Sequence, residues 1–322
     1  MIELMQGDCL ERMKEIESGS VDMVLTDPPY FKVKNESWDR QWNKPEAFLS
    51  WLELCVVQWH RILKPNGSLY CFASPQMGSR VELRISKYFS INNNLVWSKP
   101  TGRWKQAHKE GLRTFFPSTE RIIFAEHYGA DKIFIDGCDK LKATELTGFV
   151  FEPIRAYLDR LPCSYDEAGK ALGWTSASIR HCFTGGDKFW RMPTEVKYNA
   201  ISDSFPGIFH LEYEELTSWH RELKKEREFL RRPFNVTAKV PYTDVWTFDP
   251  VRAYAGKHPC EKPQDMLRHI INASTRQNAM VLDCFMGTGS TGIACHDLNR
   301  KFIGIELDDN YFKIAQERIS AV

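Results

Sequence analysis

Short apolar runs that end at acidic or turn-forming residues mark both ends of the chain. The clearest lie at 21–26, 280–283 and 301–306. Apolar runs of this length with turn signals on either side are typical of buried strands. Two further runs, at 95–97 and 121–124, predict additional strands. Because these strands come from opposite ends of the sequence, we expect one α/β core to which both ends contribute.

The middle of the chain has helical periodicity instead. Residues 166–183 have a small apolar face, a turn at Gly173 and hydroxyl residues that can begin a second helix, which is a helix–turn–helix pattern. Apolar residues recur at helical spacing through 213–229, and Pro233 follows. This long helix is interpreted as a scaffold or a contact between protomers. A return strand is expected at 244–248.

The strand at 21–26 ends abruptly in an acid, two prolines and an aromatic residue. These four residues are Asp27, Pro28, Pro29 and Tyr30. Open α/β sheets bind ligands at the carboxyl ends of their strands, which favours a functional role. A simple turn is the alternative, since Asp-Pro and Pro-Pro pairs are common in turns.

A glycine turn follows the strand at 280–283. Gly287, Gly289 and Gly292 stand where this strand gives way to a helix. A phosphate loop is excluded because no Gly-Lys-Ser/Thr follows. The Gly-x-Gly-x-x-Gly spacing matches a dinucleotide fingerprint, but nothing downstream resembles a second nucleotide-binding repeat. We therefore expect a smaller ligand, and Glu306 at the end of the next strand suits a ribose diol.

Together these segments resemble the DNA amino-methyltransferases, which use S-adenosyl-L-methionine to methylate an exocyclic base nitrogen. Residues 27–30 match the catalytic motif of that family, and 285–289 match its cofactor motif Phe-x-Gly-x-Gly. Residues 7–9, 63–69 and 258–263 are similar to further segments of the family. The catalytic motif precedes the cofactor loop, which is the mark of the permuted beta group.

The resemblance implies a doubly wound, mostly parallel seven-stranded sheet of the S-adenosylmethionine methyltransferase type, circularly permuted, with a mainly helical target-recognition insert. The catalytic half is expected at 1–130, the insert at 131–240 and the cofactor-binding half at 241–322. A chain of 322 residues is long enough for one α/β core and a smaller module.

The expected chemistry is alignment of a weak nucleophile. The lone pair of a base amine is delocalised into the ring, and two acceptors on its N–H bonds would draw electron density back onto nitrogen. The Asp27 carboxylate and the Pro28 carbonyl are the candidate acceptors, since consecutive prolines fix the backbone. Tyr30 offers a face on which a flipped base can stack, worth about 1–3 kcal/mol.

The resemblance also implies the cofactor site. Asp8 is expected at the cofactor's adenine, Glu306 at its ribose, and Lys262 at its carboxylate. The full expected set is Asp8, Cys9, Asp27, His258, Lys262, Asp283, Phe285, Met286, Gly287, Gly289, Ser290, Thr291 and Glu306. Adenine N6 is the expected target rather than cytosine N4, because the first motif position of the family tends to be Asp or Asn for adenine.

Two stretches are candidates for DNA contacts. The loop at 99–113 combines basic residues with a tryptophan, as phosphate contacts and a wedge beside an extruded base require; a solvated loop is the alternative. The second helix of the helix–turn–helix could read a major groove, although such hairpins are also common packing units. The candidates are Arg103, Trp104, Lys105, Lys109, Arg113, Ser176, Ser178, Arg180 and His181. The charged run at 224–232 alternates acids and bases, which indicates pairing within an exposed helix.

Composition sets broad limits. With 43% hydrophobic and 26% charged residues the chain is of ordinary globular type. No apolar run reaches the roughly 18 residues of a membrane span, and no secretory signal is evident. A net charge of +1 requires any DNA-binding charge to be local. Nine cysteines without a Cys-x-x-Cys pair suggest reduced thiols in the cytosol. We expect a cytoplasmic, nucleoid-associated protein that binds double-stranded DNA, holds no metal and forms a homodimer.

Two other classes of function compete with this interpretation. One is a methyltransferase for RNA adenine or a protein glutamine, which the long insert disfavours. The other is a cofactor-free DNA-binding regulator, which the intact Asp27, Tyr30, Gly287 and Gly289 disfavour. Within the family itself, DNA cytosine N4 is the alternative target.

Overall fold

A computed structural model describes most of the chain. The described residues are 1–31, 33, 39–100, 110, 113, 115–126, 150–183, 191–236, 242–252, 254 and 259–322, and the side chains of 181–183 lie outside this set. The chain divides into two compact units. The first combines Met1–Gly137 with Arg232–Val322, and the second is Cys138–Arg231. The second unit lies inside the expected insert at 131–240, and its role in target recognition stays a prediction.

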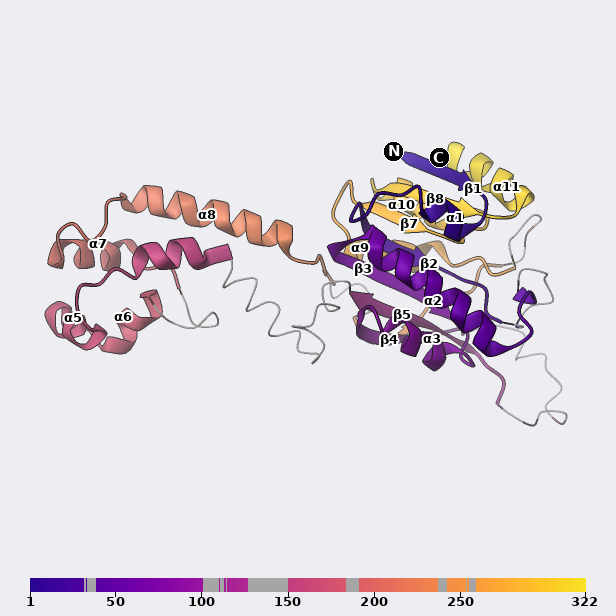
Figure 1. The fold of residues 1–322 in the computed structure, drawn as a ribbon, viewed down its shortest axis with the longest axis horizontal. Coiled ribbons are helices and arrows are strands. Elements are labelled where there is room, and N and C mark those ends of the chain that lie inside the picture. Colours follow the sequence, from indigo (N-terminus) through magenta and orange to yellow (C-terminus); the bar gives the residue numbers. More distant parts are fainter. Residues whose placement is uncertain are drawn as a thin grey trace. The chain divides into compact units, whose positions relative to one another are not determined.

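One sheet organises the first unit (Figure 1). Its strands, in spatial order, are β1 (Ile2–Gln6), β8 (Lys301–Glu306), β7 (Met280–Asp283), β2 (Val21–Thr26), β3 (Leu63–Ala73), β5 (Thr119–Glu126), β4 (Ser90–Ser98) and β6 (Val245–Thr247). Neighbouring strands run parallel, except that β5 is antiparallel to both β3 and β4.

The expected α/β fold with a mostly parallel sheet is confirmed. The expected number of seven strands was wrong, because the described residues form an eight-stranded sheet. The predicted return strand at 244–248 is confirmed as β6, which extends the sheet edge by pairing with β4. The Val96 amide also donates to the Asp244 carbonyl at 2.8 Å. No predicted run covers the strand β1, at the opposite edge of the sheet.

Strands from opposite ends of the chain lie side by side at the centre of the sheet. Met23 and Val24 of β2 are in register with Val281 and Leu282 of β7. Because the two strands are parallel, their carboxyl ends reach the same edge of the sheet. This pairing brings the tetrapeptide that begins at Asp27 beside the glycine turn after β7.

Helices cover both faces of this sheet (Figure 1). The helices α1 (Cys9–Met13), α2 (Pro45–Ile62) and α3 (Gly78–Ile85) contribute to one apolar cluster, and α9 (Gln264–Ser274), α10 (Ser290–Asp297) and α11 (Asp309–Ser320) to another. The strands alternate between the two clusters: Val24 belongs to the first, and Met23 and Leu25 belong to the second. Alternation of this kind is the period-two pattern of a strand buried on both faces.

The described residues of the second unit form helices joined by loops. This unit contains a helix over 150–158 and then α5 (Tyr165–Leu172), α6 (Ser176–Phe183), α7 (Glu195–Ser204) and α8 (Tyr213–Leu230). Ser164 and Glu167 form a capping box that starts α5, and Gly173 ends it with a left-handed φ of 67°. The predicted helix–turn–helix and the predicted long helix are therefore confirmed as elements. None of the helices in the described ranges combines the length and the apolar character needed to cross a membrane.

Candidate active site

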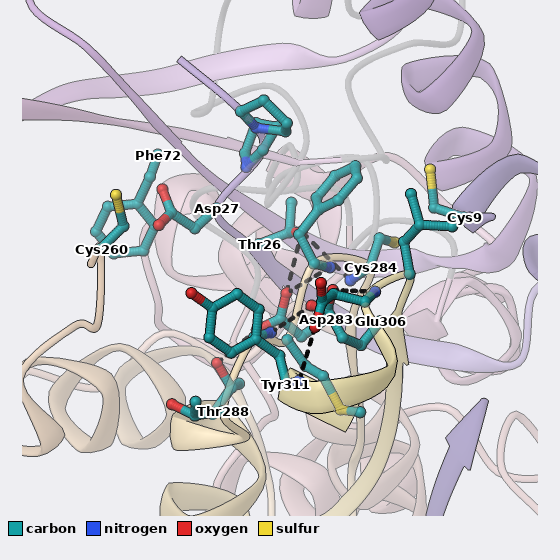
Figure 2. A pocket seen from close by; sticks show the side chains of 18 of the residues that line it. Cys9, Thr26, Asp27, Phe72, Cys260, Asp283, Cys284, Thr288, Glu306 and Tyr311 are labelled. Carbon is teal, nitrogen blue, oxygen red and sulfur yellow. Dashed lines mark hydrogen bonds between the residues drawn. The ribbon is translucent and has the colours of Figure 1, made fainter. Parts of the chain in front are cut away.

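A cavity of about 610 Å³ lies at the carboxyl ends of the central strands. This volume falls in the range of about 300–1,000 Å³ that small-molecule sites occupy. The residues around it come from the ends of β1, β2, β7 and β8 and from the segment before α9, and Figure 2 shows several of them from close by. The lining includes Gly7, Asp8, Cys9, Asp27, Pro28, Pro29, Tyr30, Phe72, Lys262, Asp283, Phe285, Met286, Gly287, Ser290, Thr291 and Glu306.

Asp27 forms an ion pair with Lys262 inside this cavity. The Lys262 Nζ donates to Asp27 Oδ2 and, at 3.1 Å, to the Cys260 carbonyl. Burial raises the pKa of the Asp27 carboxyl, and the Lys262 ammonium opposes this rise. Burial alone would lower the pKa of Lys262, but Asp27 and Glu120 together raise it above its ordinary value. The lysine is thus held as a cation beside the carboxylate.

Glu120 connects this ion pair to Tyr30. Its Oε2 lies 3.5 Å from Lys262 Nζ and accepts a hydrogen bond from the Tyr30 phenol at 2.9 Å, and Lys99 pairs with Oε1. The Tyr30 amide donates to the buried Asp39 at 2.7 Å. Burial raises the pKa of the Tyr30 phenol, so this group remains a neutral donor. The tyrosine ring is fixed at both its backbone and its hydroxyl.

Asp283 organises the glycine turn on the opposite side of the cavity. Its Oδ2 accepts from the Thr291 hydroxyl at 2.7 Å, and its Oδ1 accepts from the Phe285 amide at 3.1 Å and the Thr26 hydroxyl at 3.2 Å. Figure 2 shows Asp283 beside Thr26, as expected for neighbours on β7 and β2. Burial raises the pKa of the Asp283 carboxyl to about 7. This side chain therefore fastens the turn to the adjacent strand.

Glu306 holds the middle of the turn. Its Oε2 accepts from the Gly287 amide at 2.9 Å, and its Oε1 accepts from the Asp308 amide at 2.8 Å. Gly287 has a φ of 53°, a left-handed conformation that favours glycine. Burial raises the pKa of the Glu306 carboxyl. The glycine turn and the end of β8 are locked together beside the cavity.

Comparison with known proteins identifies the family. The model of the N6/N4 DNA methylases matches residues 21–317. The chain belongs to this family. Type II methyltransferase M2.DpnII of Streptococcus pneumoniae is 46% identical over 99% of this chain and 89% of its own. DNA adenine methyltransferase YhdJ of Escherichia coli (strain K12) is 28% identical over 98% of this chain and 82% of its own.

Solved methylases share the fold. The crystal structure of the M1.HpyAVI–SAM complex aligns with a TM-score of 0.53 at 19% identity, covering 99% of both chains. The cytosine-N4-specific PvuII DNA methyltransferase aligns with a TM-score of 0.55 at 13% identity, covering 99% of this chain and 90% of that one. The family uses S-adenosyl-L-methionine, which confirms the expected cofactor, and the expected enzyme class, a DNA methyltransferase, is confirmed as well.

The structure of the methylase places most of the expected site residues around one cavity and shows their partners within the protein. Lys262, expected at the cofactor's carboxylate, contacts Asp27. Asp8 lines the cavity, and its Oδ1 caps α1 by accepting the amides of Leu10 at 2.9 Å and Glu11 at 3.3 Å. The direct contacts of Lys262 and Asp8 with the cofactor stay predictions.

Four other expected cofactor residues have structural partners or lie elsewhere. Gly289 is not among the cavity-lining residues; its φ is 80°, and a Cβ there would meet Ile319 Cδ1 at 2.9 Å. Cys9 Sγ lies 3.9 Å from Cys55 Sγ in the buried core. The Ser290 hydroxyl donates to Glu261 Oε1 at 3.1 Å. His258 lies outside the described residues.

The candidates for DNA contact are only partly described. Arg103, Trp104, Lys105, Lys109 and the side chain of His181 lie outside the described set. Ser176, Ser178 and Arg180 lie on α6 of the second unit, where Arg180 is exposed. Arg113 is also exposed. Pairing within α8 is confirmed for the charged run, since Glu228 forms ion pairs with both Arg227 and Arg231.

Sequence reasoning missed Glu120, Phe72 and Asp39 at this site, and it assigned Lys99 to the candidate DNA-contact loop at 99–113. The antiparallel strand β5 explains the positions of Glu120 and Lys99. Because β5 runs opposite to β3 and β4, its amino end and Lys99, which follows β4, lie at the same edge as the carboxyl ends of the parallel strands. An acid at the start of an otherwise apolar strand was the one available signal for Glu120. Within the described residues, no cluster of three or more His, Cys, Asp or Glu side chains could hold a metal ion.

Proposed function

We propose that this methylase transfers the methyl group of S-adenosyl-L-methionine to the N6 amine of an adenine that is flipped out of duplex DNA. One observation carries the proposal: the acid–proline tetrapeptide after β2 and the glycine turn after β7 line the same cavity. Two segments that the family motifs place far apart in sequence can thereby act on one pair of reacting groups. The adenine named for the Escherichia coli relative agrees with this choice of target.

The cofactor would be held by the side of the cavity that the glycine turn forms. Gly287 lets the backbone approach a ligand closely, and Glu306 and Asp8 offer carboxylates at the adjacent strand ends. When bound there, the cofactor supplies a methyl group already activated by its positively charged sulfur. The donors and acceptors of the lining, together with the cavity volume, suit a molecule that carries a nucleoside and an amino acid.

The target amine would be held by the opposite side. The Asp27 carboxylate and the Pro28 carbonyl accept its two N–H bonds, which draws electron density onto the nitrogen and orients its lone pair. The Tyr30 ring, fixed through its hydroxyl and its amide, supports the flat face of the base. The chain's contribution is then mostly alignment and electrostatic stabilisation.

The target must leave the duplex before it can reach this cavity, since its amino group is otherwise buried in base pairing. We assign DNA contacts to the basic loop at 99–113 and target recognition to the second unit, with α6 as the reading helix. The helix α8 would serve a homodimer contact. The circular permutation of the fold and a cytoplasmic location belong to the same proposal.

Cytosine N4 is the competing target. A cytosine-N4-specific enzyme shares the fold, and a carboxylate can accept a hydrogen bond from either amine. Fold similarity therefore does not discriminate between the two bases.

The test is methylation of unmethylated duplex DNA by the purified protein with radiolabelled S-adenosyl-L-methionine, followed by nucleoside analysis. We expect N6-methyladenine. Formation of N4-methylcytosine would show that the target base is cytosine and not adenine. Methyl transfer to RNA or protein, but not to DNA, would show that the proposed substrate class is wrong. Calorimetry with the cofactor separates an enzyme from a regulator, because a protein without measurable affinity for the cofactor cannot catalyse this reaction.

A further inference from the structure

Buried charges of both signs surround Asp27. Lys262 pairs with Asp27 and approaches Glu120, and Glu120 in turn pairs with Lys99. The side chains of Lys262, Glu120 and Asp27 are only 7%, 14% and 17% exposed. Charges shielded from water to this degree depend on one another for stabilisation. A change at one member should therefore change the charge state of the next.

The position of the Lys262 ammonium is fixed from several directions. It donates to Asp27 and to the Cys260 carbonyl. It also lies 4.8 Å from the ring centroid of Phe72 and 5.3 Å from that of Tyr30, within the range of cation–π contact. An ammonium held in this way acts on Asp27 from a constant direction.

Lys262 is the main support for the charge of Asp27, and the Tyr30 hydroxyl makes a smaller contribution. The Asp27 Oδ1 is shielded from water and has no hydrogen-bond partner among the described residues. An unpaired oxygen of this kind disfavours the ionised carboxylate. Lys262, on Oδ2, compensates for this, while the Glu120 carboxylate shares the same ammonium and weakens the compensation.

We infer that Lys262 and Glu120 are positioning residues that set the charge and the direction of the Asp27 carboxylate for methyl transfer. The inference rests on the proposed function, in which Asp27 receives the target amine. Lys262 keeps Asp27 ionised before transfer. Glu120 limits this effect, so that Asp27 stays basic enough to take up the proton that the methylated amine releases: an N–H bond breaks, its electron pair remains on nitrogen, and an O–H bond forms on Asp27.

Besides Lys262 and Glu120, three titratable groups interact with Asp27, and the test must separate them. They are Tyr30, Cys71 and Asp283. Lys99 and Cys260 face the partners of Asp27, since Lys99 pairs with Glu120 and Cys260 lies beside Lys262 and Tyr30. After burial itself, Lys262 and Glu120 have the largest influence on the pKa of Asp27, and they act in opposite directions. Removing the charge of Lys262 and removing that of Glu120 should therefore shift the pKa of Asp27 in opposite directions.

The first experiment measures single-turnover methyl transfer to DNA between about pH 5.5 and about pH 9.5 for Lys262→Gln and Glu120→Gln. We expect Lys262→Gln to move the midpoint of the rate–pH profile to higher pH. Near pH 7 its transfer rate should be about tenfold below the wild-type rate, since one pKa unit is a factor of ten, and the rate should recover at higher pH. We expect Glu120→Gln to move the midpoint of the profile to lower pH. Lys64→Gln and Glu53→Gln are matched controls, because their ion pairs with Asp22 and Arg84 lie outside the cavity lining. Both controls should keep the wild-type midpoint.

The second experiment needs neither cofactor nor DNA. Carbon-13 NMR of aspartate-labelled protein, with the Asp27 carboxyl assigned through Asp27→Asn, follows the titration of that group directly. We expect a higher pKa of Asp27 in Lys262→Gln and a lower one in Glu120→Gln. Unchanged values, or shifts in the same direction, overturn the inference. If Lys262→Gln does not fold, Glu120→Gln decides alone. Opposite NMR shifts in a protein that transfers no methyl group to DNA would refute the proposed function and retain the charge roles.

Discussion

On the Asp27 side of the cavity, charged side chains from strand ends and from the segment before α9 pair with one another. On the glycine-turn side, carboxylates instead accept hydrogen bonds from nearby backbone amides. Lys262, Glu120 and Lys99 all belong to the first group. Glu306 and Asp283 represent the second, since each accepts at least one amide of the turn. In the proposed function, the first arrangement tunes the charge of the carboxylate that receives the target amine, and the second fixes the shape of the surface that holds the cofactor.

This difference predicts a selective loss on the first side. Asp27→Ala removes an acceptor for the amine but none of the hydrogen bonds that fasten the turn. We expect single-turnover methyl transfer to fall by at least about 100-fold, the scale on which positioned acid–base groups act. Cofactor affinity, measured by calorimetry, should stay within about threefold of the wild-type value, since a factor of three is below 1 kcal/mol. A near-normal transfer rate would show that the carboxylate is not the acceptor.

On the second side, the titration of Asp283 should make the stability of the fold depend on pH. Its folded-state pKa of about 7 lies above the ordinary value of 3.8, because burial disfavours the ionised form. The native state therefore binds this proton more tightly than the unfolded state. The contribution of Asp283 to the free energy of unfolding is fully present below about pH 4, decreases as pH rises, and is lost above about pH 7.

The measurement is urea unfolding of wild type and Asp283→Asn at several pH values. The variant cannot ionise, so it should gain stability relative to wild type across this window, by about 4 kcal/mol for three pKa units. A constant offset between the two proteins at every pH would contradict the assigned pKa. The difference between the proteins is the informative quantity, because the carboxylates that do not interact with Asp283 titrate equally in both; Asp27 does interact with it.

Local sequence patterns predicted the second side better than the first. The strand ends, the glycine turn and Glu306 follow one another closely along the chain, so their motif reports their geometry. Glu120 meets both Lys262 and Lys99 only because β5 pairs antiparallel with β4 and β3, a register that no motif encodes.

Side-chain roles were harder to predict than positions. Asp8 was expected at the cofactor, but a side chain at the amino end of a helix also caps it, and sequence alone does not separate the two roles. Gly289 matched the cofactor motif, and the space beside its Cα is also restricted, because an added Cβ would meet Ile319 and Ala315 of α11. Both cases depend on packing between segments that are distant in sequence.

Gly289→Ala tests whether the turn is rigid. A left-handed φ strains alanine by about 1–2 kcal/mol, and the new Cβ would also crowd Ile319 and Ala315. With overpacking added, we expect a loss of about 2–4 kcal/mol in the free energy of unfolding. Gly173→Ala is the control, since its φ is 67° but no atom lies within 4 Å of the added Cβ. It should lose only the strain. Equal losses at the two positions would mean that α11 does not restrict the turn.

The smallest effect should come from an ion pair that water reaches. Lys225 pairs with Glu222 on α8, and their side chains are 68% and 63% exposed, whereas Lys262 is 7% exposed. Solvent screens the exposed pair, so Lys225→Met should change the free energy of unfolding by less than about 0.5 kcal/mol in thermal or urea unfolding. The charged side of the cavity is then distinguished by the exclusion of water and not by the number of its ion pairs. A loss at Lys225 comparable with that of Lys262→Gln would remove this distinction, since the same pairing would then matter equally in water and in the cavity.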